Sequence, residues 1–140
     1  MDIQLKYNIA EATLRIFCGV LFLYQGYDKL FNIKIKGVVE TFVSSSKKTK
    51  IPVQLLTAIT TYTSITEFIG GALLILGLFK SYALAFLGLD LILVAVAFST
   101  LEPMWDMRHV FPRLAMVVTL LILPDDFEKF SLDKILNLSY

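Results

Sequence analysis

The chain has little of the chemistry from which most catalytic and metal centres are built. Its 140 residues include one cysteine, Cys18, and one histidine, His109. A single cysteine excludes an intramolecular disulfide, a CxxC redox pair and a thiolate metal site within this chain. A single histidine excludes a bis-histidine haem or a zinc cluster built from this chain alone. The sequence also has no glycine-rich phosphate loop and no nucleophile elbow, so we predict no metal site and no enzyme that acts alone.

Charge is scarce as well. Charged residues make up 18% of the chain and the formal net charge is +1, whereas 56% of the residues are hydrophobic and the mean hydropathy is +0.71. This composition is too apolar for an ordinary soluble domain, and the length allows only one membrane bundle. The near-neutral charge gives no sign of a nucleic-acid partner. The sequence therefore predicts a small integral membrane protein, with the lipid bilayer as its first partner.

Four apolar stretches approach or exceed the length that a helix needs to cross a bilayer, about 20 residues. They are predicted at about residues 9–31, 55–79, 82–100 and 107–124. The first stretch follows no compact basic region and continues past any plausible cleavage motif, so it is predicted to remain as a span. The turn at Lys80 and Ser81 is so short that the second and third spans must be antiparallel neighbours. The predicted fold class is an all-α, single-domain membrane bundle of four helices.

Residues 34–46, between the first two spans, carry an apolar stripe with helical spacing. The stripe consists of Ile35, Val38, Val39, Phe42 and Val43. The segment is too short to span, which leaves two alternatives: an amphipathic helix along the membrane surface, or a connecting helix packed on the bundle. Residues 125–140 are predicted to form a surface tail. Four crossings place both termini on the same side of the membrane. Lysine and arginine are in excess on the opposite side, beside the two main loops, which predicts that the loops are cytoplasmic and the termini periplasmic.

Four ionisable residues lie within or near the predicted hydrocarbon region: Arg15, Glu67, Asp90 and Arg113. A charge at the bilayer centre costs about 3 kcal/mol or more unless it is paired, protonated or in contact with water. Two bases and two acids can form a neutral structural network. Alternatively, the carboxylates line a polar cavity for a proton, an ion or a head group, with His109 at its mouth. Both alternatives predict that the two acids face the inside of the bundle.

Helical spacing also predicts which residues share a face. Glu11 and Arg15 are four residues apart and can pair. In the second span, small, hydroxyl-bearing and acidic residues share one face, which is predicted to lie inside because small residues let helix backbones approach. This face comprises Thr60, Thr63, Ser64, Glu67, Gly70, Gly71 and Leu74. At the end of the first span an interfacial belt with a charged stop is predicted, made of Tyr24, Tyr27, Asp28 and Lys29.

Two stretches resemble the DoxX-like membrane proteins. Residues 14–31, LRIFCGVLFLYQGYDKLF, resemble the first helix of that family, with its arginine, apolar run and Gly-x-x-Lys-Leu ending. Residues 67–79, EFIGGALLILGLF, are similar to its second-helix pattern of a glutamate, glycines and a Leu-Gly-Leu-Phe exit. The resemblance implies a four-helix bundle in the bacterial inner membrane, with Arg15 and Glu67 as the clearest of the family's polar positions. The cysteine pair associated with the redox branch of the family is absent.

Three functions are compatible with these features. The first, which we expect, is a non-enzymatic accessory or assembly subunit whose small-residue faces and surface helix engage a larger membrane protein. The second is a small membrane subunit of a quinone-linked oxidoreductase, of the thiosulfate:quinone type that the resemblance implies. Quinone would then lie near Glu67 and Asp90, and this chain would hold no other cofactor. The third is a small proton-linked carrier, which with four spans would need at least a homo-oligomer.

Overall fold

The described part of the chain is helical throughout its regular structure. The computed structural model describes residues 2–46, 51–101 and 110–137. Helix α1 (Ile3–Tyr27) continues into a π-helical turn, η1 (Asp28–Asn32). It is followed by α2 (Lys34–Ser46), α3 (Val53–Leu76), α4 (Lys80–Leu101) and α5 (Val110–Ile122). A 3-10 turn, η3 (Asp125–Phe127), and the one-turn helix α6 (Leu132–Ile135) come last. The predicted all-α class is confirmed.

Three helical segments are long and apolar enough to cross a bilayer. They are Ile3–Asn32, Val53–Leu76 and Lys80–Ser99, with 30, 24 and 20 residues. The second is about 36 Å long, against a hydrocarbon core of about 30 Å. Helix α5 is apolar but has only 13 residues, and residues 107–109, where the fourth span is predicted to begin, lie outside the described residues. The chain is thus a multi-pass membrane protein with three full-length candidate spans and a shorter apolar helix.

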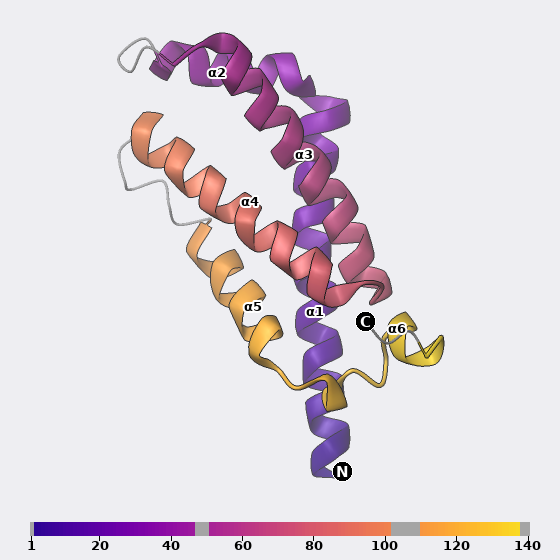
Figure 1. Cartoon of the computed structure of the whole chain (residues 1–140). Helices are drawn as coiled ribbons and strands as arrows, with labels where there is room; N and C mark the ends of the chain where they lie inside the picture. Colours follow the sequence, from indigo (N-terminus) through magenta and orange to yellow (C-terminus); the bar gives the residue numbers. More distant parts are fainter. Residues whose placement is uncertain (1, 47–50, 102–109, 138–140) are drawn as a thin grey trace.

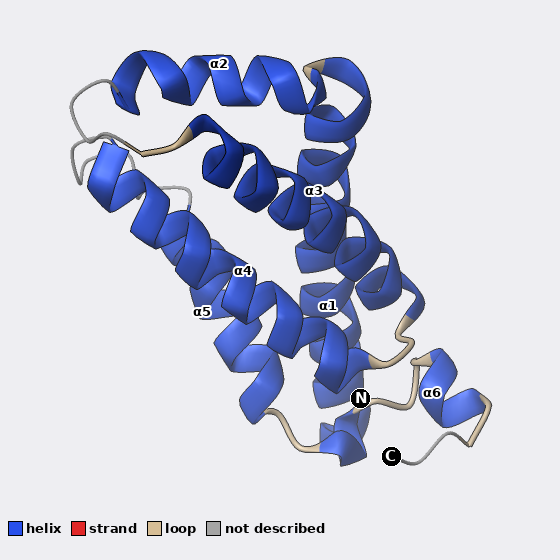
Figure 2. Ribbon diagram, turned by 45° about the horizontal axis from the view of Figure 1, so that its top comes forward, coloured by secondary structure: helices blue, strands red, loops and turns tan. Residues whose placement is uncertain are grey.

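The helices form a bundle that α2 closes at one end. Helices α1 and α3 lie side by side, and α4 and α5 cover one flank of that pair (Figure 1). Helix α2 lies across the end of the bundle at which α1 finishes (Figure 2), and the beginning of α1 and α6 lie at the opposite end. Helix α2 contacts α3 and α4, with Val39 of its apolar stripe buried, and its predicted place along the membrane surface stays a prediction. The Phe42 ring lies 5.7 Å from the Phe98 ring of α4, edge to face.

The contact between α1 and α3 is made at the backbone. A Cβ atom at Gly26 would lie 2.4 Å from the backbone nitrogen of Phe68, and one at Gly71 would lie 2.4 Å from that of Leu23. No larger residue fits at these separations, so the glycines set the distance between the two helices. The face of the second span that is predicted to lie inside is confirmed as the buried face of α3.

The turn between α3 and α4 falls earlier than the sequence suggests. Helix α3 ends at Leu76 because Gly77 adopts the left-handed conformation, with φ of +67°. The next amide closes the helix end, since Leu78 N donates to the carbonyl oxygen of Leu73 at 3.0 Å. Lys80, which is predicted to lie in the turn, is instead the first residue of α4 and is 3% exposed.

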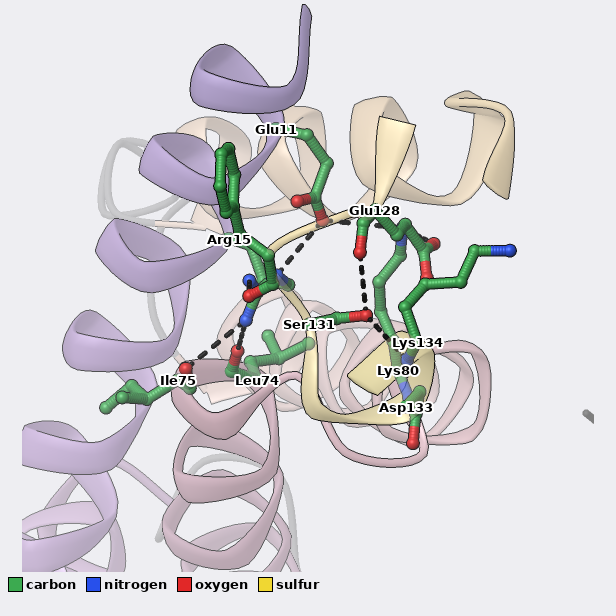
Figure 3. Close-up of polar contacts among 10 residues, drawn as sticks. Glu11, Arg15, Leu74, Ile75, Lys80, Glu128, Ser131, Asp133 and Lys134 are labelled. Atoms are coloured by element: carbon green, nitrogen blue, oxygen red, sulfur yellow. Dashed lines mark hydrogen bonds and ion pairs between the residues drawn. The ribbon is translucent and has the colours of Figure 1, made fainter. Parts of the chain in front are cut away.

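A buried cluster of charges closes the end of the bundle opposite α2 (Figure 3). Arg15 Nε donates a hydrogen bond to Glu11 Oε1 at 3.0 Å, which confirms the predicted pair. Its Nη1 donates to the carbonyl oxygen of Leu74 at 2.7 Å, and its Nη2 donates to that of Phe130 at 3.0 Å. One guanidinium group therefore joins α1, the end of α3 and the segment before α6. We call the whole set of buried charges at this end of the bundle the end cluster; it consists of Glu11, Arg15, Lys80, Glu128 and Asp133.

Lys80 and Asp133 hold the start of α4 against the segment that runs from η3 through α6. Lys80 Nζ hydrogen-bonds to Glu128 and lies 3.5 Å from Glu11 Oε1. Burial raises the pKa of Glu128, and the hydrogen bond from Lys80 opposes that shift. The Asp133 carboxylate accepts hydrogen bonds from the backbone N–H groups of Phe79, at 3.1 Å, and Lys80, at 3.2 Å. It thus caps α4 from a position 53 residues away in the chain.

The glycine contact can be tested with one added methyl group. Gly26→Ala is expected to lower stability by about 1–3 kcal/mol, because the methyl group would meet the backbone of Phe68 and push α1 away from α3. Gly88→Ala in α4 is the matched control, since its Cβ would lie 3.7 Å from Val117, an ordinary contact. Thermal unfolding in detergent, followed by circular dichroism, measures both. Equal midpoints for Gly26→Ala and the wild type would contradict the backbone contact.

The cap that Asp133 provides can be tested by amide exchange. Asp133→Ala is expected to remove about 1 kcal/mol of local stability, because two N–H groups at the start of α4 lose their acceptor. Hydrogen–deuterium exchange should become about fivefold faster in α6 and at the start of α4. The control is Asp126→Ala, which removes an exposed carboxylate from η3. Identical exchange in the two variants would show that the cap contributes nothing.

Candidate functional site

Lys29 and Glu67 form a buried ion pair inside the bundle. Lys29 Nζ donates a hydrogen bond to Glu67 Oε1 at 2.8 Å and lies 2.7 Å from Oε2. The lysine side chain is 18% exposed and the glutamate side chain 1%. Glu67 belongs to the candidate span Val53–Leu76, where a lone carboxylate is unfavourable. The ammonium group therefore offsets much of the penalty for removing this carboxylate from water.

The glycine contact explains how Lys29 reaches this carboxylate. Gly26 lies against the backbone of Phe68, the residue after Glu67. Lys29 is three residues beyond Gly26, so it projects from the same face of the helix one turn later. The π-helical turn begins here: the amide of Ile33 donates to the carbonyl of Asp28 at 2.8 Å. Such turns occur frequently at functional sites.

The sequence pattern does not indicate Lys29 as a site residue, because a lysine that follows an apolar run is typical of the membrane interface. A signal was available in the Gly-x-x-Lys spacing of residues 26–29. A glycine in a transmembrane helix marks a close approach to another helix, and the residue one turn away then faces that helix.

Asp90 and Arg113 lie in the same region. Asp90, on α4, is 0% exposed, and neither of its carboxylate oxygens has a hydrogen-bond partner in the described structure. The next residue of α4, Leu91, lines one space together with Lys29, Glu67 and Arg113. The Arg113 guanidinium lies over the Phe22 ring, 5.9 Å from its centroid, at a distance typical of a cation–π contact.

The structure divides the four predicted site residues between two places. Glu67, Asp90 and Arg113 come together with Lys29. Arg15 belongs instead to the end cluster, where Glu11 is its acidic partner. His109, predicted at the mouth of a cavity, lies outside the described residues. Two separate charged groups therefore replace the single network that the sequence suggested.

A cavity of about 490 Å³ lies beside the Lys29–Glu67 pair, and we call it the central cavity. Its polar lining consists of Tyr24, Gln25, Asp28, Lys29, Glu67 and Arg113. Its apolar lining consists of Leu21, Ile33, Leu91, Val94, Phe98 and Val110. The exposed side chains of Tyr24 and Asp28 lie on its open side. Its volume falls in the range of about 300–1,000 Å³ that is typical of sites for small organic ligands.

The hydrogen-bonding groups of the central cavity are not all occupied. Gln25 Oε1 is buried and accepts no hydrogen bond from the described residues. Arg113 donates no hydrogen bond to the described residues, and its guanidinium group lies over the Phe22 ring. A guanidinium group without an acceptor can donate to the oxygen atoms of a head group, and an amide oxygen without a donor can accept from a head-group hydroxyl. The nearby carboxylates are groups that can hold or release a proton.

The comparisons with known proteins concern the part of the chain that builds this site. The family model for DoxX matches residues 10–100, which are 91 of the 140 residues. The match includes Lys29, Glu67 and Asp90, whereas Arg113 lies beyond it. No curated protein and no solved structure matches the chain. Because the family model covers well over half of its length, the chain belongs to the DoxX family of membrane proteins.

Proposed function

We propose that this chain is a membrane subunit of a larger complex and that its own contribution is to bind a quinone-type molecule in the central cavity. The observation that carries the proposal is the ion pair between Lys29 and Glu67, beside a cavity of about 490 Å³ that also contains Arg113. A few polar groups among apolar walls are typical of sites that bind and orient small organic ligands.

The residues of the central cavity fit the chemistry of a quinone. Quinone oxygens accept hydrogen bonds, and Arg113 has N–H groups without a described acceptor. The apolar walls suit the ring, with Leu91, Val94 and Phe98 along one side. A bound quinone supplies two-electron chemistry coupled to two protons, and Glu67 and Asp90 are groups that could hold those protons. The electrons would come from a partner chain in the complex.

The glycine contact argues against a purely structural accessory role. As predicted from the sequence, that role engages a partner through faces of small residues and through the helix at residues 34–46, so one part of it requires small-residue faces that remain free. Gly19, Gly26 and Gly71 are instead occupied within the chain, where each lies against the neighbouring α1 or α3 helix. The accessory role therefore has less support than the sequence suggested, and a proton-linked carrier would have to use the same cavity.

Quinone binding can be measured with the purified protein. Equilibrium dialysis in detergent against a short-chain ubiquinone analogue is expected to show saturable binding. Arg113→Gln is expected to weaken it about tenfold or more, because hydrogen bonds from a charged group contribute about 1.5–3 kcal/mol. The control is Lys36→Gln, which removes a cation whose side chain is 88% exposed. Equal affinity in both variants and the wild type would contradict a site at Arg113.

The complex itself can be tested by purification from the native membrane. A redox-active membrane protein is expected to co-purify at fixed stoichiometry, together with quinone that Arg113→Gln fails to retain. A stoichiometric partner without quinone would support the accessory role instead. Proton-coupled uptake of a solute into liposomes that contain this chain alone would support the carrier.

A further inference from the structure

A second, smaller cavity extends from the central cavity beneath α2. Its volume is about 260 Å³, and we call it the α2 cavity. The two cavities share five lining residues: Gln25, Lys29, Ile33, Val94 and Phe98. They therefore meet around the side chain of Lys29. The α2 cavity is below the size of about 300 Å³ at which pockets for whole small molecules begin, so it suits an extension of a ligand rather than a separate one.

The α2 cavity is apolar in its chemistry although threonines line it. The Thr63 hydroxyl donates to the carbonyl of Thr60 at 3.1 Å, and the Thr41 hydroxyl donates to that of Gly37 at 3.1 Å. These two hydroxyl donors are satisfied within their own helices, so neither needs an acceptor in the cavity. Val38 and Phe42 of α2 provide further apolar surface. A hydrocarbon chain meets few unsatisfied donors there.

We propose that the α2 cavity holds the hydrocarbon tail of the ligand whose head group lies in the central cavity. The tail passes Lys29 at the junction of the two cavities, and α2 covers it. The edge-to-face contact between Phe42 and Phe98 links α2 to α4 where the two helices border this space. Helix α2 is then a specificity element that favours ligands with a flexible chain. This inference rests on the proposed ligand site.

The position of the tail can be tested with a pair of probes that share one head group. The first is a tail-less benzoquinone, and the second carries a ten-carbon alkyl chain on the same ring. Thr63→Leu adds bulk to the α2 cavity alone, at a residue that is 5% exposed. Each methylene group that leaves an apolar site weakens binding about fourfold, so displacing two of them weakens the tailed probe about fifteenfold. The tail-less probe should bind Thr63→Leu as it binds the wild type.

Thr57→Leu is the matched control, because it makes the same substitution on an exposed face of the same helix. The Thr57 hydroxyl likewise donates to a carbonyl of its own helix, that of Val53, at 2.8 Å. Val38→Phe, on the α2 side of the cavity, is the second variant if Thr63→Leu does not fold. Size-exclusion chromatography identifies the folded variants before binding is measured.

The outcomes separate this inference from the proposed function. Weaker binding of the tailed probe alone, in Thr63→Leu or Val38→Phe but not in Thr57→Leu, supports the tail site. If both probes bind every variant as they bind the wild type, the head-group site stands and the tail site is wrong. If neither probe binds the wild type, the proposed function fails and the tail site fails with it.

Discussion

The backbone contact between α1 and α3 is the constraint on which both charged groups depend. Gly26 and Gly71 let these helices approach until a methyl group no longer fits between them. Side chains of the continuous segment Ile3–Asn32 can then reach across to α3 at both ends of the contact. Lys29 reaches a carboxylate at one end, and Arg15 reaches the carbonyl of Leu74 at the other. A wider separation would part Lys29 from the Glu67 carboxylate and Arg15 from the carbonyl of Leu74.

The two ends of the bundle differ in how tightly they are closed. At the end cluster, side chains from α1, α4 and the segment before α6 bond to one another or to backbone carbonyls. At the α2 end, the Lys29–Glu67 pair stands beside open space, and Asp90 is buried without a described hydrogen bond. Removal of one partner from a buried ion pair is strongly destabilising, because the other charge stays buried without a partner. The end cluster thus holds α1, α4 and the segment before α6 together, whereas the Lys29–Glu67 pair leaves the central cavity open beside it.

Helical periodicity accounts for what the sequence could predict. It placed Glu67 on the buried face of α3, paired Glu11 with Arg15 and identified the apolar stripe of α2, because each depends on residues a few positions apart. It could not join Lys29 to Glu67 or Lys80 to Glu11, which are 38 and 69 residues apart. Those pairs depend on how far one helix is shifted along another, and hydropathy contains no such information. The turn at Gly77 was missed because its left-handed conformation ends α3 early.

The end cluster also has a consequence for membrane insertion. Glu11 and Arg15 leave the ribosome early, Lys80 in the middle, and Glu128 with Phe130 late, since synthesis runs from the N-terminus. Lys80 is buried in the finished fold, yet its carboxylate partner Glu128 is made only after α5. Until then the bundle contains an ammonium group with incomplete pairing. The hydrogen bonds of the end cluster are therefore complete only when residues 128–133 have been made, so closure of this end of the bundle is a late step of folding.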